Sequence, residues 1–388
     1  MSASPLKILL CALEPSADAL GADLMAALRK RCPEAAFIGC GGALMAAQGL
    51  ESLFPVDRFS VIGPVAALQA LPAALKAADR LADLAEKEKP QTAILIDSWS
   101  FSKIAAMRLR KRAPEMRLIK YVAPQVWASR PRRAQKTAEL FDGVLCLFGF
   151  ETGYFEQAGA NTRWVGHPGF QAILAHDSDK AAFRARHNIG AGPLLAVLPG
   201  SRAAELKRHA APFRGAIEKL LTDFPDLRVV VSAAPGAENA VRALAAGWPG
   251  GAFVVEGEER FEACRAADAA LAASGTATAE LALLGTPMVV AYKVELLTEL
   301  WARAVLTTPH VSLVNIAAGR EVAPELLQRD CRPERLAAAL APLMRDGPAR
   351  RSQIEAFPAI ARLLAGERSP GDAAAAAVLD WLGTGKTP

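Results

Sequence analysis

Short apolar runs alternate with longer segments of helical periodicity along almost the whole chain. The first run, KILLCAL, precedes residues 16–31, where Leu20, Leu24 and Leu28 recur on one helical face. The later runs each have the length of a strand: TAILIDS, RLIKYVA, GVLCLF, LLAVLPGS, LRVVVSAA, GAFVVEG, AALAAS and TPMVVAYK. Strands that alternate with helices favour parallel sheets with crossover helices. The pattern therefore predicts an α/β fold.

The alternating pattern occurs as two series, and the break between them lies near VGHPGFQ, residues 165–171. A chain of 388 residues is also longer than a single hydrophobic core usually supports. We predict two Rossmann-like, doubly wound parallel-sheet domains, residues 1–168 and 169–368. Ligands of open parallel sheets bind at the carboxyl ends of the strands. The residues that directly follow each apolar run are therefore the candidates for a site.

Composition excludes several classes of protein and of site. The six cysteines are scattered without a C-x-x-C pair, which argues against a disulfide scaffold and a zinc site and fits a reducing cytoplasm. No apolar run reaches the roughly 18 residues that span a bilayer, and no signal peptide stands out. Asp177 and Asp179 spell D-x-D, but they lie in a polar loop, where we expect a helix cap. We predict neither a metal nor another cofactor.

The net charge of +5 is unevenly spread, and one basic stretch contains a single acid, Glu115. Its basic residues are Lys103, Arg108, Arg110, Lys111, Arg112, Arg117, Lys120, Arg130, Arg132, Arg133 and Lys136. The stretch is either a solvated helix face with a basic loop or a surface that attracts an anionic membrane. It holds few aromatic side chains on which bases could stack, so we expect no nucleic-acid partner.

The sequence LPGSRAAE places Ser201, Arg202 and Glu205 directly after the apolar run 194–198. Gly200 permits a close backbone approach, and the guanidinium of Arg202 offers paired donors that fit phosphate oxygens. Two interpretations are open at this point. The segment is an ordinary helix start that Ser201 caps, or it is a cradle for an anion at a helix N-terminus.

A second candidate follows the run AALAAS, where Ser274, Gly275 and Thr276 precede a helix that contains Glu280. Small residues and free N–H groups at a helix start form an anion pocket, and Glu280 could then accept hydrogen bonds from vicinal sugar hydroxyls. The alternative is a good N-terminal cap with an acidic first turn. Two such helix starts in one half of the chain together favour a nucleotide diphosphate as the ligand.

Three further polar residues occupy positions that invite a function. Asp97 follows the apolar run AILI in the first domain, where it could act as a general base or cap a helix. Trp127 lies in a proline-bounded loop after a strand. Asn315 stands between apolar residues, where burial requires hydrogen-bond partners for its amide.

Together these motifs resemble the lipid-A-disaccharide synthases, glycosyltransferases of the GT-B fold. The resemblance runs nearly end to end and is carried, in order, by LEPSADALGADL, IGCGGALM, YVAPQVWA, VGHP, LPGSRAAE, SGTATAE with TPMVVAYK, and VSLVNIAAGREVAPELLQ. It implies two Rossmann-like domains that face an interdomain cleft, and a C-terminal helix, residues 369–388, that returns to the first domain. Whether that helix returns within one chain or by exchange between two stays open, so a homodimer is an alternative.

The resemblance also implies a reaction and a location. Such enzymes join UDP-2,3-diacylglucosamine to 2,3-diacylglucosamine 1-phosphate, release UDP and form a β-1,6-linked disaccharide for lipopolysaccharide. The implied protein is an inverting hexosyltransferase, cytoplasmic and peripherally associated with the anionic cytoplasmic face of the inner membrane. In the family, the C-terminal domain holds the UDP part of the donor, and the N-terminal domain faces the acceptor and the membrane.

Roles carry over to this chain motif by motif. Asp97 matches the family's proposed base, Arg202 would stabilise the departing diphosphate, and Asn315 matches a buried asparagine of the catalytic set. The donor pocket would comprise Ser201, Arg202, Glu205, Ser274, Gly275, Thr276 and Glu280, and the acceptor side Glu14, Ser16, Asp18 and Trp127. Arg202 and the helix dipoles would take the place of a metal at the diphosphate.

The chain departs from the family pattern mainly in its first half. The family's first loop is Gly-Glu-x-Ser-Gly-Asp, whereas residues 13–18 are Leu-Glu-Pro-Ser-Ala-Asp, so both glycines are replaced. A Cβ can obstruct a ligand that passes close to the backbone, so the acceptor side is where this chain would differ. Residues 61–84 either form core or meet a bilayer. The rival functions are a GT-B enzyme with another lipid acceptor and a non-catalytic paralogue that binds UDP-sugar or anionic lipid.

Overall fold

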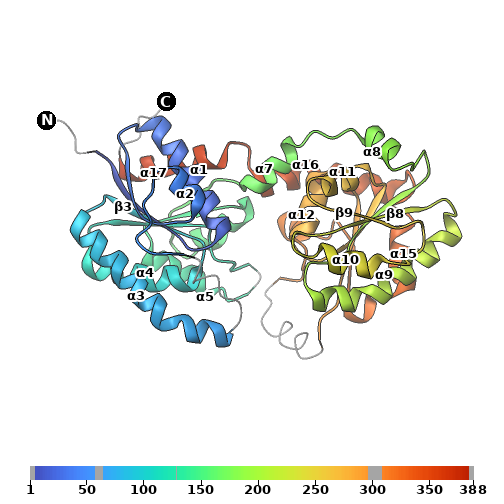
Figure 1. Ribbon diagram of the computed structural model, residues 1–388, viewed down its shortest axis with the longest axis horizontal. Coiled ribbons are helices and arrows are strands. Elements are labelled where there is room, and N and C mark those ends of the chain that lie inside the picture. Colours follow the sequence, from blue (N-terminus) through green and yellow to red (C-terminus); the bar gives the residue numbers. More distant parts are fainter. Residues whose placement is uncertain (1–4, 57–63, 128, 296–307, 384–388) are drawn as a thin grey trace. The chain divides into compact units, whose positions relative to one another are not determined.

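Two compact units make up the fold, and each is built around a six-stranded parallel sheet (Figure 1). The computed structural model describes residues 5–56, 64–127, 129–295 and 308–383. The first unit contains residues 1–168 and 365–388, and the second contains residues 169–364. The two parallel sheets with their helices confirm the predicted α/β class.

The first sheet has the strand order β2-β1-β3-β4-β5-β6, and all its pairs are parallel. Its strands are β1 (Lys7–Ala12), β2 (Ala36–Cys40), β3 (Thr92–Ile96), β4 (Arg117–Tyr121), β5 (Gly143–Cys146) and β6 (Thr162–Trp164). Its helices are α1 (Pro15–Arg31), α2 (Ala43–Ala47), α3 (Pro64–Glu88), α4 (Trp99–Arg112), α5 (Arg132–Leu140), the 3-10 turn η2 (Gly149–Glu151), α6 (Thr152–Glu156) and α17 (Pro370–Leu382).

Alternate residues of each strand enter different hydrophobic layers. Ile8 and Leu10 of β1 join a core cluster with α1 and α17, whereas Leu9 and Cys11 join a second cluster with α3 and α4. In Figure 1, α1 and α17 lie on one side of the first sheet, and α3 and α4 lie on the other. Because helices cover both faces, the strands appear in the sequence as continuous apolar runs rather than as an alternation.

The C-terminal helix α17 is part of the first unit, although the whole second unit precedes it in the chain. It packs against α1, and Ala374, Val378 and Trp381 belong to the same core cluster as Leu24 of α1. The indole of Trp381 packs so closely on β5 that a Cβ at Gly143 would lie 2.5 Å from a ring carbon. The helix therefore completes one face of the first sheet.

The second sheet has the order β12-β11-β10-β7-β8-β9, again fully parallel. Its strands are β7 (Leu194–Leu198), β8 (Arg228–Ser232), β9 (Phe253–Val255), β10 (Ala269–Ala273), β11 (Met288–Tyr292) and β12 (Glu325–Leu327). The helices are α7 (Pro168–Ala175), α8 (Lys180–Arg186), α9 (Ala203–Asp223), α10 (Glu238–Ala245), α11 (Glu259–Ala266), α12 (Thr276–Leu283), α14 (Leu313–Ala318), the 3-10 turn η3 (Gln328–Asp330), α15 (Pro333–Leu340) and α16 (Pro348–Ala365). The predicted cap is confirmed: Asp179 accepts a 2.8 Å hydrogen bond from the N–H of Ala181 at the start of α8.

The predicted basic stretch is not one solvated surface, and for Lys120 the prediction is wrong. Lys120 lies on β4 and is fully buried. Arg108 of α4 pairs with Asp79 of α3 at 3.1 Å, and Arg112 pairs with Asp83 of the same helix. These acids come from a helix that precedes the stretch in the chain, so a count of charges within the stretch could not include them.

The segment 61–84, considered above as core or as a bilayer contact, is described only in part. Its residues 61–63 lie outside the described residues. Ala78 and Leu81 of α3 are buried in the core cluster with α4, whereas Leu71 is exposed. Among the helices that the structure describes, none combines the length and the apolar character that a membrane crossing requires.

Candidate active site

In both sheets, one pair of adjacent strands marks the point where the direction of winding changes. In the first unit the chain continues from β1 to β2 on one side and to β3 on the other. In the second unit it continues from β7 to β8 on one side and later to β10 on the other. Such a switch opens a crevice at the carboxyl ends of the strands, where ligands of open α/β sheets bind. We call β1/β3 the first switch point and β7/β10 the second.

Two predicted carboxylates, Glu14 and Asp97, occupy the first switch point, one after β1 and the other after β3. Burial, followed by the negative charge of Asp97, raises the pKa of the Glu14 carboxyl, while the charge of Lys120 opposes the shift. Asp97 and Ser98 both have left-handed backbone, with φ of +52° and +38°. Such residues cost about 1–3 kcal/mol each and cluster at active sites.

A buried amine lies beside this pair of carboxylates. Lys120 Nζ donates hydrogen bonds to the carbonyl oxygens of Asp97 at 2.5 Å, Tyr121 at 3.1 Å and Leu95 at 3.2 Å. Burial lowers the pKa of the Lys120 amine to about 7, and the charge of Asp97 is the largest effect that opposes this shift. The first switch point therefore combines two carboxylates with one enclosed cation.

Asp18, predicted for the acceptor side, has its carboxylate engaged within the fold. It is buried and accepts hydrogen bonds from the N–H groups of Gly42, Leu44 and Met45, at 2.8, 2.9 and 3.1 Å. These bonds cap the N-terminus of α2 and fasten it to α1. Ser16, by contrast, is exposed in the first turn of α1.

The two residues that replace family glycines have buried side chains. Leu13 and Ala17 are 2% and 1% exposed. Leu13 joins the cluster with α3 and α4, and Ala17 joins the cluster with α1 and α17. Both replacements therefore contribute side chains to the core of the first unit.

Trp127, the fourth residue predicted for the acceptor side, connects the loops that follow β4 and β5. Its indole Nε1 donates to Glu151 Oε1 at 3.1 Å, and the other oxygen of Glu151 accepts from the N–H of Phe148 at 3.2 Å. Burial raises the pKa of Glu151 to about 7, although these hydrogen bonds act in the opposite direction. The buried ring also meets Phe150 edge-on, with 5.5 Å between the ring centres.

At the second switch point, the carboxylate of Glu205 organises the loop after β7. It accepts hydrogen bonds from the N–H groups of Ser201 at 3.2 Å and Arg202 at 3.4 Å, and from the hydroxyl of Tyr292 at 3.1 Å. Burial opposes ionisation of Glu205, but these bonds outweigh it and lower the pKa of the carboxyl. The loop is thus held by a half-buried carboxylate of its own helix.

The helix start after this loop does not match the first of the two interpretations, a cap formed by Ser201. Helix α9 begins at Ala203 with Arg202 as its N-cap, so the Ser201 hydroxyl does not cap it. Gly200 has φ of +114°, and a Cβ there would lie 2.7 Å from a Glu205 oxygen. The Arg202 side chain is 79% exposed and pairs with Glu205 at 3.0 Å. An exposed guanidinium therefore stands at the N-terminus of a 21-residue helix.

A buried histidine of α9, His209, also holds the loop after β7. Its Nδ1 lies 2.8 Å from the carbonyl oxygen of Pro199, and its Nε2 accepts from the N–H of Lys293 at 3.2 Å. An Nε2 that accepts a hydrogen bond carries no proton, so this geometry requires neutral imidazole with the proton on Nδ1. Burial, the largest effect, lowers the pKa of His209 accordingly.

The loop after β10 supplies the other half of the second switch point. Gly275 is the N-cap of α12 with φ of +148°, and the space where its Cβ would be is open. Ser274 Oγ donates to the carbonyl of Val311 at 2.9 Å. Glu280 is paired with Arg260 of α11 at 2.8 Å, and its side chain is 14% exposed. Thr276 is exposed at the first position of the helix.

Asn315 is fully buried, and its amide is satisfied by its own unit. Its Nδ2 donates to Ala323 O at 2.8 Å and Glu325 Oε1 at 2.9 Å, and its Oδ1 accepts from the N–H groups of Val322 and Ala323 at 2.7 and 2.9 Å. Glu325 also accepts from both the N–H and the hydroxyl of Ser312. The asparagine therefore fixes the segments on both sides of α14.

Comparison with known proteins decides which family this arrangement represents. A family model described as lipid-A-disaccharide synthetase matches residues 8–376. The chain belongs to this family. The lipid-A-disaccharide synthase of Ruegeria pomeroyi is 41% identical over 389 residues, 97% of this chain and 96% of that protein. The one of Pseudomonas syringae pv. tomato is 42% identical over 382 residues, 98% of each. The chain is therefore a glycosyltransferase of lipid A biosynthesis.

Solved structures with low sequence identity share the fold of this lipid-A-disaccharide synthase family member. The crystal structure of Acinetobacter baumannii MurG has a TM-score of 0.58 at 16% identity and covers 98% of this chain and 99% of its own. The S. aureus MnaA–UDP co-structure has a TM-score of 0.63 at 11% identity and covers 99% of each chain. These likenesses confirm the GT-B fold.

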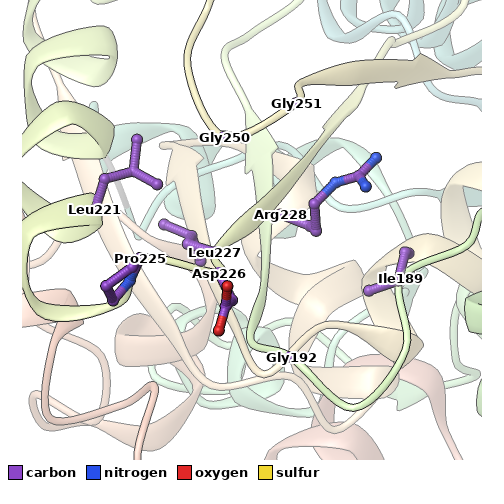
Figure 2. Close-up of a pocket in the computed structure, with 9 residues that line it drawn as sticks. All are labelled: Ile189, Gly192, Leu221, Pro225, Asp226, Leu227, Arg228, Gly250 and Gly251. Atoms are coloured by element: carbon purple, nitrogen blue, oxygen red, sulfur yellow. The ribbon is translucent and has the colours of Figure 1, made fainter.

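A pocket of about 550 Å³ lies in the second unit but away from the second switch point. Ile189 and Gly192 precede β7, Arg228 opens β8, and Gly250 precedes β9 (Figure 2). Because the strands are parallel, this pocket lies at their amino ends, opposite the predicted donor residues. Within the described part of the chain, no three His, Cys, Asp or Glu side chains gather as metal ligands would.

The structure brings the predicted residues together in two groups, and sequence reasoning missed the residues that hold them. Glu14 and Asp97 follow the adjacent strands β1 and β3 at the first switch point, and the loops 200–202 and 274–276 follow the adjacent strands β7 and β10 at the second. The missed residues are Lys120, His209, Arg260 and Glu325. A signal existed for two of them. Lys120 interrupts an apolar strand, and His209 lies on the helical face that also contains Leu206 and Phe213.

Proposed function

We propose that this family member is an inverting hexosyltransferase that condenses UDP-2,3-diacylglucosamine with 2,3-diacylglucosamine 1-phosphate to give the β-1,6-linked disaccharide 1-phosphate and UDP. One observation carries the proposal above all. Asp97, which matches the family's proposed base, lies at the first switch point in a left-handed turn that it shares with Ser98. A strained turn of this kind persists where the surrounding structure holds it, as at active sites.

The two units would divide the substrates between them. Residues 1–168, with the C-terminal helix, would hold the acceptor beside Glu14, Ser16 and Asp97. The second unit would hold the UDP part of the donor at the second switch point. The support for this division is chemical, because an exposed guanidinium at a helix N-terminus favours a diphosphate, whereas a carboxylate is needed to accept a hydroxyl proton.

Inverting transfer is a single displacement. Asp97 accepts the proton of the acceptor's 6-hydroxyl while the oxygen of that hydroxyl attacks the anomeric carbon of the donor. The bond from that carbon to the diphosphate breaks, and UDP leaves with the electron pair. Arg202 and the N-terminus of α9 would stabilise the charge that develops on the diphosphate. Arg202 would exchange its partner Glu205 for a phosphate oxygen.

The remaining predicted residues would act on position rather than on the reacting atoms. Asn315 would be a positioning residue, since its amide is used within the fold. Ser274 would keep the loop after β10 close to Val311. Glu280 would contact the donor sugar only if it exchanged Arg260 for a sugar hydroxyl. Asp18 and Trp127 would shape the acceptor side through the loops that they hold.

The test follows UDP release and disaccharide formation by purified protein from the two named substrates, with a chelator present. We expect disaccharide from the wild type and a loss of about 10²–10⁴-fold in Asp97→Asn, the usual contribution of a general base. Glu115→Gln, which removes an exposed carboxylate of the same unit, is the matched control and should retain full activity. Disaccharide that disappears with chelator would overturn the metal-independent mechanism.

Two other outcomes separate the rival functions. Binding of UDP-sugar without disaccharide, combined with transfer to another lipid acceptor, would keep the donor site and replace the acceptor. Binding without transfer to any lipid acceptor would identify a non-catalytic paralogue. In that paralogue, Asp97→Asn would change nothing that can be measured.

We also propose that the protein acts at the cytoplasmic face of the inner membrane through its remaining basic residues. Lys103, Lys111, Arg130 and Arg132 are exposed and have no carboxylate partner among the described residues. Sedimentation with phosphatidylglycerol vesicles should fall in Arg130→Glu/Arg132→Glu and with added salt, as for an electrostatic contact. Phosphatidylcholine vesicles are the uncharged control. Salt-sensitive binding to RNA but not to vesicles would contradict the proposal.

A further inference from the structure

Lys120 is the most deeply enclosed cation near the first switch point, and its contacts are unusual. Its side chain is fully buried on β4, which lies between β3, the strand that Asp97 follows, and β5. All three of its hydrogen bonds go to backbone carbonyl oxygens: Leu95 and Asp97 on the β3 side, and Tyr121 of its own strand. No carboxylate among the described residues lies within ion-pair distance of its Nζ.

Three carbonyl partners define the protonation state that the geometry needs. An ammonium has three N–H donors and no acceptor, so it can satisfy all three oxygens. A neutral amine has two donors and a lone pair, which would face the third carbonyl. The two remaining donors cannot serve all three oxygens, so one hydrogen bond from a charged donor, about 1.5–3 kcal/mol, is lost. The arrangement at Lys120 is therefore complete only while the amine carries its proton.

Two of the three carbonyls that accept from Lys120 lie in or directly before residues with left-handed backbone. Asp97 has φ of +52°, and Val122, which follows Tyr121, has φ of +67°. The hydroxyl of Ser102 in α4 donates to the same Asp97 carbonyl at 2.7 Å. The Asp97 backbone is thus held by the ammonium, by Ser102 and by its own N–H, which donates to Tyr121 O at 2.9 Å.

We propose that Lys120 is a positioning residue of the transfer reaction, and that its ammonium holds the turn at Asp97 in the conformation that places the base at the acceptor site. The inference rests on the proposed function of Asp97 and adds to it a pH dependence. When Lys120 loses its proton, one of its three hydrogen bonds to these carbonyls is lost, the turn loosens, and transfer slows.

The charged and titratable groups that face the amine come from three elements. Asp97 follows β3, Glu14 follows β1, and Cys11 lies within β1, and each favours the protonated amine. Burial acts against all three and lowers the pKa of Lys120 to about 7. From α4, on the same face of the sheet, the contact is the uncharged Ser102. Deprotonation therefore falls within the range in which the enzyme can be assayed.

The test compares the wild type with Lys120→Met and Lys120→Arg from pH 6 to pH 9. We expect the wild-type kcat to fall as pH rises through the pKa of Lys120. Lys120→Met should lose about 10- to 100-fold in kcat, the effect of a misplaced catalytic group, with KM and UDP affinity little changed and without the alkaline fall. Lys120→Arg, which stays charged, should recover part of kcat and move the fall to higher pH.

Equal kcat in the wild type and a folded Lys120→Met variant would overturn the proposal, and so would an alkaline fall that persists unchanged in either variant. If Lys120→Met does not fold, judged by circular dichroism, the wild-type profile and Lys120→Arg decide. If the wild type makes no disaccharide, the proposed function fails separately. Amide exchange then decides, because Asp97 and Val122 should exchange faster at pH 9 than the pH change alone explains. If the exchange rates of Asp97 and Val122 rose with pH only as much as those of the β1 amides, the inference would be overturned.

Discussion

At the first switch point, a buried cation donates to carbonyl oxygens, and the predicted base, Asp97, and the predicted acceptor-side residue, Glu14, both carry carboxyl groups. At the second switch point, the half-buried carboxylate of Glu205 accepts hydrogen bonds from N–H groups, and the predicted reactive group, Arg202, is a cation. The two switch points share one topology: in each, two adjacent parallel strands are followed by helices on opposite faces of the sheet. Topology therefore fixes where a site lies, and the sign of the enclosed charge fixes which backbone groups are held.

The same comparison explains how each loop keeps its shape. A cation such as Lys120 uses its three donors on carbonyls at strand ends. The carboxylates of Glu205 and Glu325 accept N–H groups that their helix starts leave without an intrahelical partner. Each of these charges thus fixes backbone groups at the end of a strand or the start of a helix, beside a predicted site residue of opposite charge.

The largest effect on stability should come from the second unit's buried amide. Asn315→Leu keeps the side-chain volume but leaves the N–H groups of Val322 and Ala323 without an acceptor. We expect the free energy of unfolding in urea to fall by about 3 kcal/mol. Asn239→Leu, at an exposed position of α10, is the matched control and should change it little. Equal losses in both would show that the network around Asn315 does not contribute.

Removal of the exposed cation at the second switch point should show that the two switch points have different roles. Arg202→Ala should weaken UDP binding, measured by calorimetry, by about 10- to 100-fold, the usual effect of a charge-assisted hydrogen bond. Asp97→Asn, at the first switch point, should leave UDP affinity unchanged. Arg214→Ala removes a guanidinium further along α9, which pairs with Glu218, and serves as the control. A loss in all three would contradict the division of roles.

Acidification should weaken the second unit through His209. Burial lowers its pKa below the value of about 6.5 that it has when unfolded, so the unfolded chain binds the proton first. The stability that neutral His209 contributes is present above pH 6.5 and is lost as pH falls through the folded pKa. The free energy of unfolding should therefore fall more between pH 7.5 and pH 5.5 in the wild type than in His209→Gln. Parallel pH profiles would contradict this.

The smallest effect should come from the ion pairs between α3 and α4 in the first unit. Arg108 and Asp79 lie 3.1 Å apart, but their side chains are 41% and 40% exposed. Arg108→Ala should lower the free energy of unfolding by less than about 1 kcal/mol. Measurement in low and high salt should show that even this difference shrinks. If Arg108→Ala lowered the free energy of unfolding as much as Asn315→Leu, exposed ion pairs would matter as much as buried polar networks, which would contradict the comparison.

Sequence reasoning located the strands and the loops after them because both depend on neighbours in the chain. An apolar run such as Leu194–Leu198 becomes a strand with both faces covered, and its end marks a site. The enclosed charges depend instead on distant partners. Glu325 meets Val311 and Asn315, and Lys120 meets Leu95, only once the chain has folded. A charge count along one stretch therefore assigned Lys120 to the surface, where it does not lie.

Helix α17 has a consequence for the order in which the protein can mature on the ribosome. Its residues Ala374, Val378 and Trp381 close the apolar layer over Leu24 and Leu28 of α1, yet they are translated after the whole of the second unit. The nascent chain therefore carries an incomplete first unit, with the α1 face of its core uncovered, while residues 169–364 are already able to fold as a contiguous unit. The half of the enzyme that is translated first is the half that is finished last.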